Sequence, residues 1–121
     1  MFDNKNKPRG LMRVYLATTN SARAIKWLSK NEAAFRQELL LLGLATPISF
    51  LFDITVNEQL VLITAILFIL FTEILNTAIE AIVDRVSFEI HPLSGLAKDL
   101  GSAAVFISLL IAICVWLSIL W

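Results

Sequence analysis

One continuous stretch, LVLITAILFILFTEILNTAIEAIVDR, limits what this chain can fold into. It covers residues 60–85 and opens with thirteen residues that carry no charge. Plotted at helical period, its later polar side chains fall within roughly 80° of arc, and they are Glu73, Asn76, Glu80 and Asp84. A helix of this length measures about 39 Å, enough to cross a bilayer and project beyond it. Because a carboxylate in lipid is costly, we expect this polar stripe to face protein, a partner or water.

The composition favours a membrane protein. The chain has 121 residues, of which 58% are hydrophobic and 17% are charged, and its mean hydropathy is +0.78. These values are too apolar for a soluble domain of this size. The length allows about three spanning helices and one amphipathic segment, so we predict a single all-α membrane domain over residues 1–121. Such a protomer has little interior, and we expect self-association to cover its buried carboxylates.

The hydrophobic pattern predicts four helices. Residues 8–30 are amphipathic with basic side chains to one side, which is typical of a helix lying in the membrane surface. The alternative is an ordinary amphipathic helix packed on protein. Transmembrane helices are predicted over residues 33–52, 58–86 and 97–120. Pro47 is expected to kink the first of these helices or to loosen one of its turns.

The basic residues indicate an orientation in the membrane. Seven of the ten Lys and Arg residues precede Glu32, and residues 53–58 contain none. The positive-inside rule then places the N-terminus in the cytoplasm and the C-terminus outside. Glu73 lies slightly deeper than the cytoplasmic interface. This topology gathers the other ionisable residues at that interface, namely Glu32, Arg36, Glu80, Asp84, Glu89, His91, Lys98 and Asp99.

Such a cluster suits phosphoryl transfer to a lipid hydroxyl. Glu32 and Glu80, from different helices, can hold Mg²⁺, which takes one or two protein carboxylates and completes its shell with phosphate and water. Lys98 and Arg13 could meet phosphate oxygens. A carboxylate in apolar surroundings, as expected for Glu73, is a stronger base toward a hydroxyl at the same depth. The sequence has neither a GxxxxGK[ST] loop nor a GxGxxG turn, so a nucleotide would be bound without the usual phosphate-binding loop.

Simpler interpretations stay open for most of these residues. Glu32 and Arg36 can equally form an interfacial ion pair across one helical turn. Only for Glu73 and Glu80 does the cost of placing a charge in lipid clearly favour a functional role. The remaining polar residues equally suit a solvated helix end, a loop or a hydrogen bond between helices, and they are Asn76, Asp84, Arg85, Glu89, His91, Lys98 and Asp99.

Three motifs carry a resemblance to a known family. They are NEAAFRQE, EILNTAIEAIVDR and GLAKDLGSAAV, and in this order and spacing the sequence resembles the small prokaryotic integral-membrane diacylglycerol kinases. The resemblance implies a homotrimer of three-helix protomers, each with a surface helix, in the bacterial inner membrane. Its active sites would be shared between neighbouring subunits. It also implies that MgATP phosphorylates the primary hydroxyl of diacylglycerol to give phosphatidic acid, and we expect no nucleic-acid partner.

The resemblance implies roles for residues at matching positions. Glu73 is implied as the catalytic base, with Asn76 supporting the site from the same motif, and Glu32 and Glu80 as the Mg²⁺ ligands. The residues implied to contact ATP are Arg13, Asn20, Glu32, Glu80, Glu89, His91, Lys98 and Asp99. Those implied to contact the lipid substrate are Arg13, Ser21, Arg36, Gln37 and Glu73.

The chain departs from the family pattern at four positions. Leu96 replaces a frequent Arg, Pro92 a common acidic residue, and Asn20 a frequent aromatic residue. Pro47 is unusual within its helix. These departures bear on the nucleotide contacts, on the loop before residue 97 and on the lipid-facing groove.

Three other functions are compatible with the same residues. A sister branch of the family phosphorylates undecaprenol instead of diacylglycerol. From a different class, carboxylates within the membrane also suit a small proton-coupled transporter. A non-catalytic assembly subunit is the third alternative.

Overall fold

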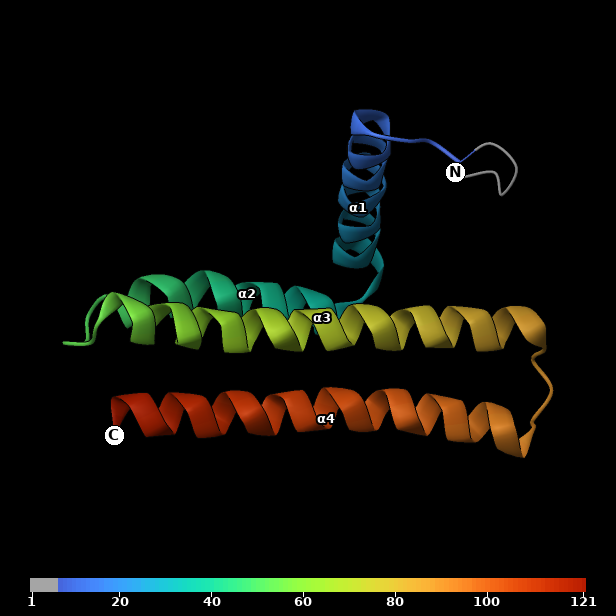
Figure 1. The fold of residues 1–121 in the computed structure, drawn as a ribbon. Coiled ribbons are helices and arrows are strands. Elements are labelled where there is room, and N and C mark those ends of the chain that lie inside the picture. The colour runs from blue at the N-terminus through green and yellow to red at the C-terminus, as the bar shows by residue number, and fades with distance from the viewer. Residues whose placement is uncertain (1–6) are drawn as a thin grey trace. The chain divides into compact units, whose positions relative to one another are not determined.

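The computed structural model describes residues 7–121, and within that range the regular secondary structure is entirely helical. The helices, drawn in Figure 1, are α1 (Leu11–Asn31), α2 (Ala33–Ser49), α3 (Val56–Val86) and α4 (Pro92–Leu120). The all-α class predicted from the sequence is therefore confirmed. Residues 1–6, which belong to the predicted single domain, lie outside the described residues.

The chain divides into two compact units, Met1–Arg36 and Gln37–Trp121. In the first unit, Gly10 precedes α1 with a φ of 64°, a backbone conformation that favours glycine. At the other end of α1, Nη1 of Arg36 donates to the carbonyl oxygens of Ser29 at 3.3 Å and Lys30 at 3.0 Å. These carbonyls belong to the last turn of a helix, where a cation is favourable.

Helix α3 begins at Val56, two residues before the predicted start at 58. Thr55 caps it, because its Oγ1 accepts a hydrogen bond from the backbone N–H of Glu58 at 3.1 Å. Oε1 of Glu58 in turn accepts from the backbone N–H of Thr55 at 3.0 Å, which completes a capping box. The helix runs for 31 residues and is long and apolar enough to cross a membrane.

Helix α4 begins at Pro92, five residues before the predicted start at 97. Nδ1 of His91 accepts a hydrogen bond from the backbone N–H of Leu93 at 3.1 Å, so His91 caps the helix. Proline suits the first helical position, since its fixed φ is helical and no N–H is needed there. This helix of 29 residues is the second that could cross a membrane.

Helix α2 ends at Ser49, three residues short of its predicted end at 52. Pro47 lies in its last turn, which continues as two tighter hydrogen bonds, from Phe50 N to Pro47 O at 3.1 Å and from Leu51 N to Ile48 O at 3.0 Å. With 17 residues it is shorter than the two candidate spans, so the third transmembrane helix stays a prediction.

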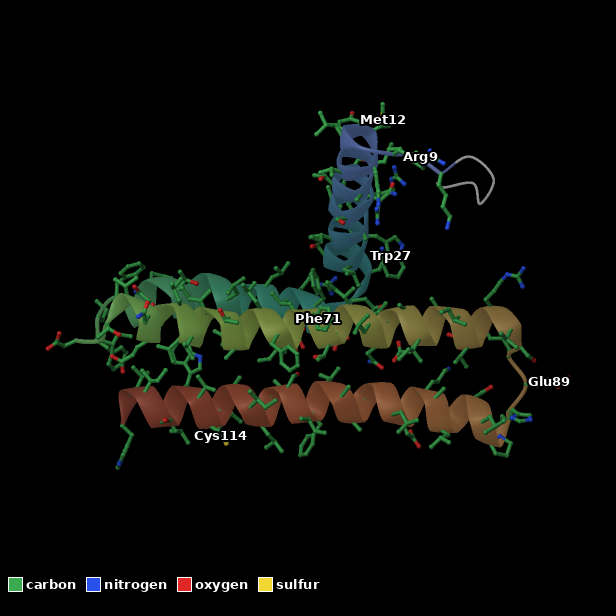
Figure 2. The ribbon with its side chains drawn as sticks, viewed as in Figure 1. Arg9, Met12, Trp27, Phe71, Glu89 and Cys114 are labelled. Carbon is green, nitrogen blue, oxygen red and sulfur yellow. The ribbon has the colours of Figure 1, made fainter. Side chains whose placement is uncertain are left out.

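Helices α3 and α4 lie side by side and run antiparallel in the second unit. The apolar core that joins them consists of Ala65, Ile69 and Ala112, with Val115 packed against it. The side chain of Cys114 points away from α3 and is exposed (Figure 2). The contact between α3 and α4 therefore covers one side of α4 and leaves its other apolar side chains uncovered.

Candidate active site

The polar stripe of α3 is buried at Glu73 and Asn76 and becomes more accessible toward Asp84. Glu73 is 7% exposed and Asn76 is 8% exposed, although both lie in a helix with many exposed apolar residues. Glu80, one turn further, is partly buried. Nδ2 of Asn76 donates to Oε1 of Glu80 at 3.4 Å. The stripe thus joins a buried carboxylate to a more accessible one along the same helix face.

A second carboxyl group from α2 lies near Glu73. The charge of Glu38 is close enough to that of Glu73 for the two to interact. Oε2 of Glu38 is buried and has no hydrogen-bond partner within residues 7–121. The resemblance implies that Glu38, the last residue of NEAAFRQE, holds the site or borders the lipid, and an acidic residue in the second turn of a predicted span is a further signal for it.

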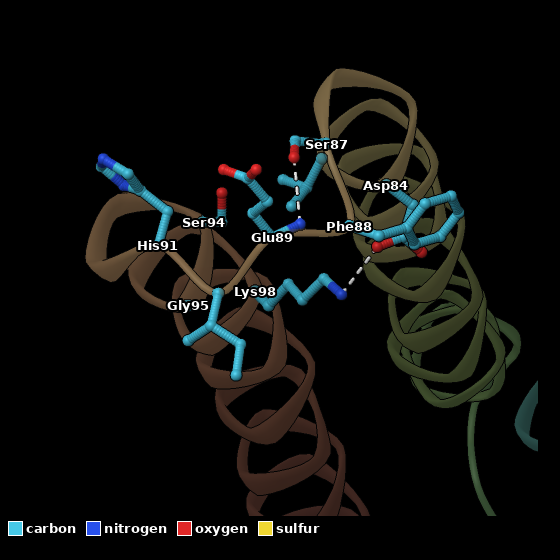
Figure 3. Close-up of a pocket in the computed structure, with 10 residues that line it drawn as sticks. Asp84, Ser87, Phe88, Glu89, His91, Ser94, Gly95 and Lys98 are labelled. Carbon is cyan, nitrogen blue, oxygen red and sulfur yellow. Dashed lines mark hydrogen bonds and ion pairs between the residues drawn. The ribbon is translucent and has the colours of Figure 1, made fainter.

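The connection between α3 and α4 surrounds a pocket of about 250 Å³ (Figure 3). It includes three of the predicted nucleotide contacts, Glu89, His91 and Lys98. Asp99, which follows Lys98, is exposed and does not line the pocket. The other lining residues are Val83, Asp84, Ser87, Phe88, Ile90, Ser94 and Gly95. Leu96, where the family often has an Arg, lies outside this set.

Two polar contacts lie among the residues that line this pocket. Nζ of Lys98 on α4 lies 2.8 Å from Oδ1 of Asp84 on α3, and both side chains are nearly half exposed. The backbone N–H of Glu89 donates to Oγ of Ser87 at 3.0 Å. Charges in water-exposed pairs remain available to ligands. The sequence pattern at Asp84 indicated a solvated helix end, and the structure adds this residue to the pocket together with Ser87.

The predicted site residues of the first unit lie on α1 and at its end. Arg13, Asn20 and Ser21 belong to α1, and Oγ of Ser21 donates to the carbonyl oxygen of Ala17 at 2.8 Å. Glu32 lies between α1 and α2. Within the described part of the chain, Arg36 bonds to the carbonyls at the end of α1 instead of pairing with Glu32.

The donor set of the second unit fits a weakly held hard cation. Within residues 7–121, no three His, Cys, Asp or Glu side chains gather as a preformed metal site. Mg²⁺ does not need such a cage, because it takes one or two carboxylates and finds its other ligands in phosphate and water. Glu80 can supply one carboxylate. Glu32 belongs to the first unit, so the shared site predicted for this pair stays a prediction.

Comparisons with known proteins agree with the motifs. The family model described as Prokaryotic diacylglycerol kinase matches residues 19–120. The diacylglycerol kinase of Escherichia coli K12 is 41% identical over 116 residues, which cover 96% of this chain and 95% of that protein. The diacylglycerol kinase of Pseudomonas aeruginosa is 46% identical over 92% of this chain and 90% of that protein. That of Haemophilus influenzae is 42% identical over 95% and 98% respectively.

These matches extend over nearly the whole chain, and two of its helices are able to cross a membrane. They include the polar stripe of α3 and the pocket beside it, so the likeness is not confined to apolar helix surface. The resemblance stated from the three motifs is confirmed. The chain is a membrane protein that belongs to the prokaryotic diacylglycerol kinase family.

Proposed function

We propose that this protein transfers the γ-phosphoryl group of ATP to the primary hydroxyl of diacylglycerol, giving phosphatidic acid. One observation carries the proposal. Helix α3 is long enough to cross a membrane and carries the buried carboxylate of Glu73. The charged pocket lies at the C-terminal end of the same helix. The rise from Glu73 to Asp84 is about 17 Å along the helix. A lipid hydroxyl and a water-borne triphosphate can therefore approach one helix from two sides.

Glu73 is the proposed base, and it accepts the proton of the lipid hydroxyl as that oxygen attacks phosphorus. Its burial excludes water, which would otherwise compete as the nucleophile. Asn76 supports the site through its hydrogen bond to Glu80. Phosphoryl transfer depends mainly on positioning and on neutralising charge, so a single base with charged neighbours is a sufficient set.

The nucleotide is proposed to bind at the pocket between α3 and α4. Lys98 lines this pocket, and it can leave Asp84 to meet a phosphate oxygen. Glu32 and Glu80 would hold Mg²⁺, which neutralises phosphate charge when bound. The other proposed nucleotide contacts are Arg13, Asn20, Glu89, His91 and Asp99. The proposed lipid contacts are Arg13, Ser21, Arg36, Gln37 and Glu73.

The assembly is proposed as a homotrimer in the inner membrane, with three transmembrane helices and one surface helix per protomer. In the protomer, 11% of the apolar window of α4 is buried, against 44% for α3. The uncovered face of α4 suits contact with lipid or with neighbouring subunits. The basic N-terminal half supports a cytoplasmic N-terminus and an external C-terminus.

The test is a lipid-phosphorylation assay on the purified protein in detergent micelles. Labelled ATP is supplied with diacylglycerol or with undecaprenol, in the presence of Mg²⁺ or of a chelator. We expect Mg²⁺-dependent labelling of diacylglycerol. Labelling of undecaprenol alone would overturn the acceptor, and absence of any lipid labelling, together with proton flux in liposomes without ATP, would overturn the kinase.

A further inference from the structure

Helix α4 packs closely against the polar stripe of α3 at a glycine. Gly101 is buried in α4. A methyl group added at this position would overlap Oδ1 of Asn76 and would lie 3.2 Å from its Cγ and 3.6 Å from its Cα. Among the four glycines of the chain, none of the other three has a neighbour within 4 Å of such an added carbon. Asn76 therefore occupies the space that a side chain at residue 101 would need.

A hydrogen bond fixes just one of the two ends of the Asn76 amide. Nδ2 donates to Oε1 of Glu80, whereas Oδ1 is buried and has no hydrogen-bond partner in the described part of the chain. The orientation of the amide therefore depends on the groups packed around Oδ1, and Gly101 is one of them, because a methyl group added there would overlap Oδ1. A change of shape there would rotate the amide away from Glu80 or would push the two helices apart.

We propose that Gly101 is a positioning residue, whose missing side chain keeps the amide of Asn76 directed at the carboxylate of Glu80. The hydrogen bond fixes one oxygen of that carboxylate and so sets the direction in which it meets a divalent cation. Hydrogen bonds of this kind behind a metal ligand determine its orientation and affinity. The inference rests on the proposed function, in which Glu80 is a Mg²⁺ ligand.

Gly101→Ala is the direct test. Alanine is normally more favourable than glycine inside a helix, so a loss of function would come from the contact with Asn76 and not from helix propensity. We expect binding of Mn²⁺, used as a probe with a non-hydrolysable ATP analogue and followed by electron paramagnetic resonance, to weaken about tenfold. The Mg²⁺ concentration for half-maximal kinase activity should rise by a similar factor, while KM for diacylglycerol stays unchanged.

Gly43→Ala is the matched control. It makes the same substitution within α2, at an exposed position with nothing within 4 Å of the added carbon. Its Mn²⁺ affinity and kinase activity should equal those of the unmodified protein. If Gly101→Ala also retains the unmodified Mn²⁺ affinity while the unmodified protein phosphorylates diacylglycerol, the inference is wrong and the proposed function stands. If the unmodified protein phosphorylates no lipid, the proposed function fails instead.

A double-mutant cycle separates positioning from simple helix packing. Because Gly101 is proposed to act through Asn76, adding Gly101→Ala to Asn76→Ala should weaken Mn²⁺ binding no further than Asn76→Ala alone. Losses that multiply in the double variant would overturn the proposal. Should Gly101→Ala fail to fold, the double variant is expected to fold, since the overlap is with the Asn76 side chain. Failure of the double variant as well would also overturn it.

Discussion

The two ends of the α3–α4 pair use polar groups in different ways. Toward the C-terminus of α4, Nε1 of Trp116 donates to the carbonyl oxygen of Leu62 at 3.1 Å. At the middle of the pair, the hydroxyls of Thr72 and Ser108 are hydrogen-bonded at 2.9 Å and both residues are buried. At the opposite end, the contact is an ion pair between Lys98 and Asp84 that is nearly half exposed.

This difference indicates that one end of the helix pair serves stability and the other end serves the chemistry. Uncharged hydrogen bonds in an apolar contact hold the helices in register, and such bonds contribute on average about 0.6 kcal/mol within a membrane. An exposed ion pair contributes little to stability, because water already solvates both charges. We therefore expect substitutions at the pocket end to change activity with little effect on stability, and substitutions at the Trp116 end to do the reverse.

The largest expected effect is at Glu73, where the two regions meet. Glu73→Gln keeps the size and burial of the side chain and removes the base. We expect kcat for lipid phosphorylation to fall by about 10²- to 10⁴-fold, with KM for ATP unchanged. The rate of phosphate transfer from labelled ATP to diacylglycerol measures this directly.

Glu58→Gln is the control for that variant, because it makes the same change on the same helix at the opposite end. Glutamine can replace glutamate in a capping box, so the cap on Thr55 should survive. Activity should be unchanged. A Glu73→Gln protein that keeps the unmodified rate would show that another group accepts the proton.

The next effect in size is expected at Lys98. Lys98→Met removes the cation of the pocket and keeps a long apolar side chain. Since a hydrogen bond to a charged group contributes about 1.5–3 kcal/mol, KM for ATP should rise about tenfold or more, while the thermal midpoint stays the same. Lys26→Met on α1, a charge loss at an exposed position, should leave KM for ATP unchanged. A lower thermal midpoint for Lys98→Met with an unchanged KM for ATP would show that the pocket end contributes to stability and not to nucleotide binding.

Much of the fold followed from local pattern, and the errors have local causes. The apolar run and polar stripe of residues 60–85 predicted α3 and the burial of Glu73, because a charge facing lipid is costly. The start of α3 was placed late, although Thr55 and Glu58 have the spacing of a capping box. The predicted start of α4 is also late, because His91-Pro92 suits a turn, whereas proline also suits the first residue of a helix.

The contacts between α3 and α4 could not be predicted in the same way. Each of the hydroxyls of Thr72 and Ser108 also lies within hydrogen-bond distance of a carbonyl of its own helix, at 2.9 Å and 2.6 Å. Each hydroxyl has one proton, so the one that donates across the pair gives up its own carbonyl, and neither residue needs a partner on the other helix. Their pairing depends on the relative register of the two helices, and apolar surfaces alone specify that register weakly. The overlap of Gly101 with Asn76 depends on the same register. For the pocket, charge and depth suggested Lys98 and the resemblance implied Glu89 and His91, whereas the pattern at Asp84 indicated only a solvated helix end.

A smaller effect, on stability, is expected at Ser108. Ser108→Ala removes the hydrogen bond to Thr72, whose hydroxyl keeps its bond to the carbonyl oxygen of Ile69. We expect a loss of about 0.6 kcal/mol in the free energy of unfolding, measured by titration with sodium dodecyl sulfate in mixed micelles. Kinase activity should not change. Ser118→Ala, at an exposed position on the same helix, should leave the unfolding midpoint where it is, and an equal loss from both variants would contradict the assignment.

The smallest effect is expected at Trp116, the far end of the pair. Trp116→Phe removes the indole N–H and keeps an aromatic ring in the same place. The carbonyl of Leu62 lies inside α3, where the helix already provides it with a donor, so no acceptor is left unsatisfied. The loss should therefore be a few tenths of a kcal/mol, below that of Ser108→Ala, and KM for ATP should be unaffected. Trp121→Phe, at a fully exposed residue, is the control and should leave the free energy of unfolding unchanged in the same titration. A change in KM for ATP on Trp116→Phe would mean that this end of the helix pair also determines the geometry of the pocket, and the separation of stability from chemistry would then be wrong.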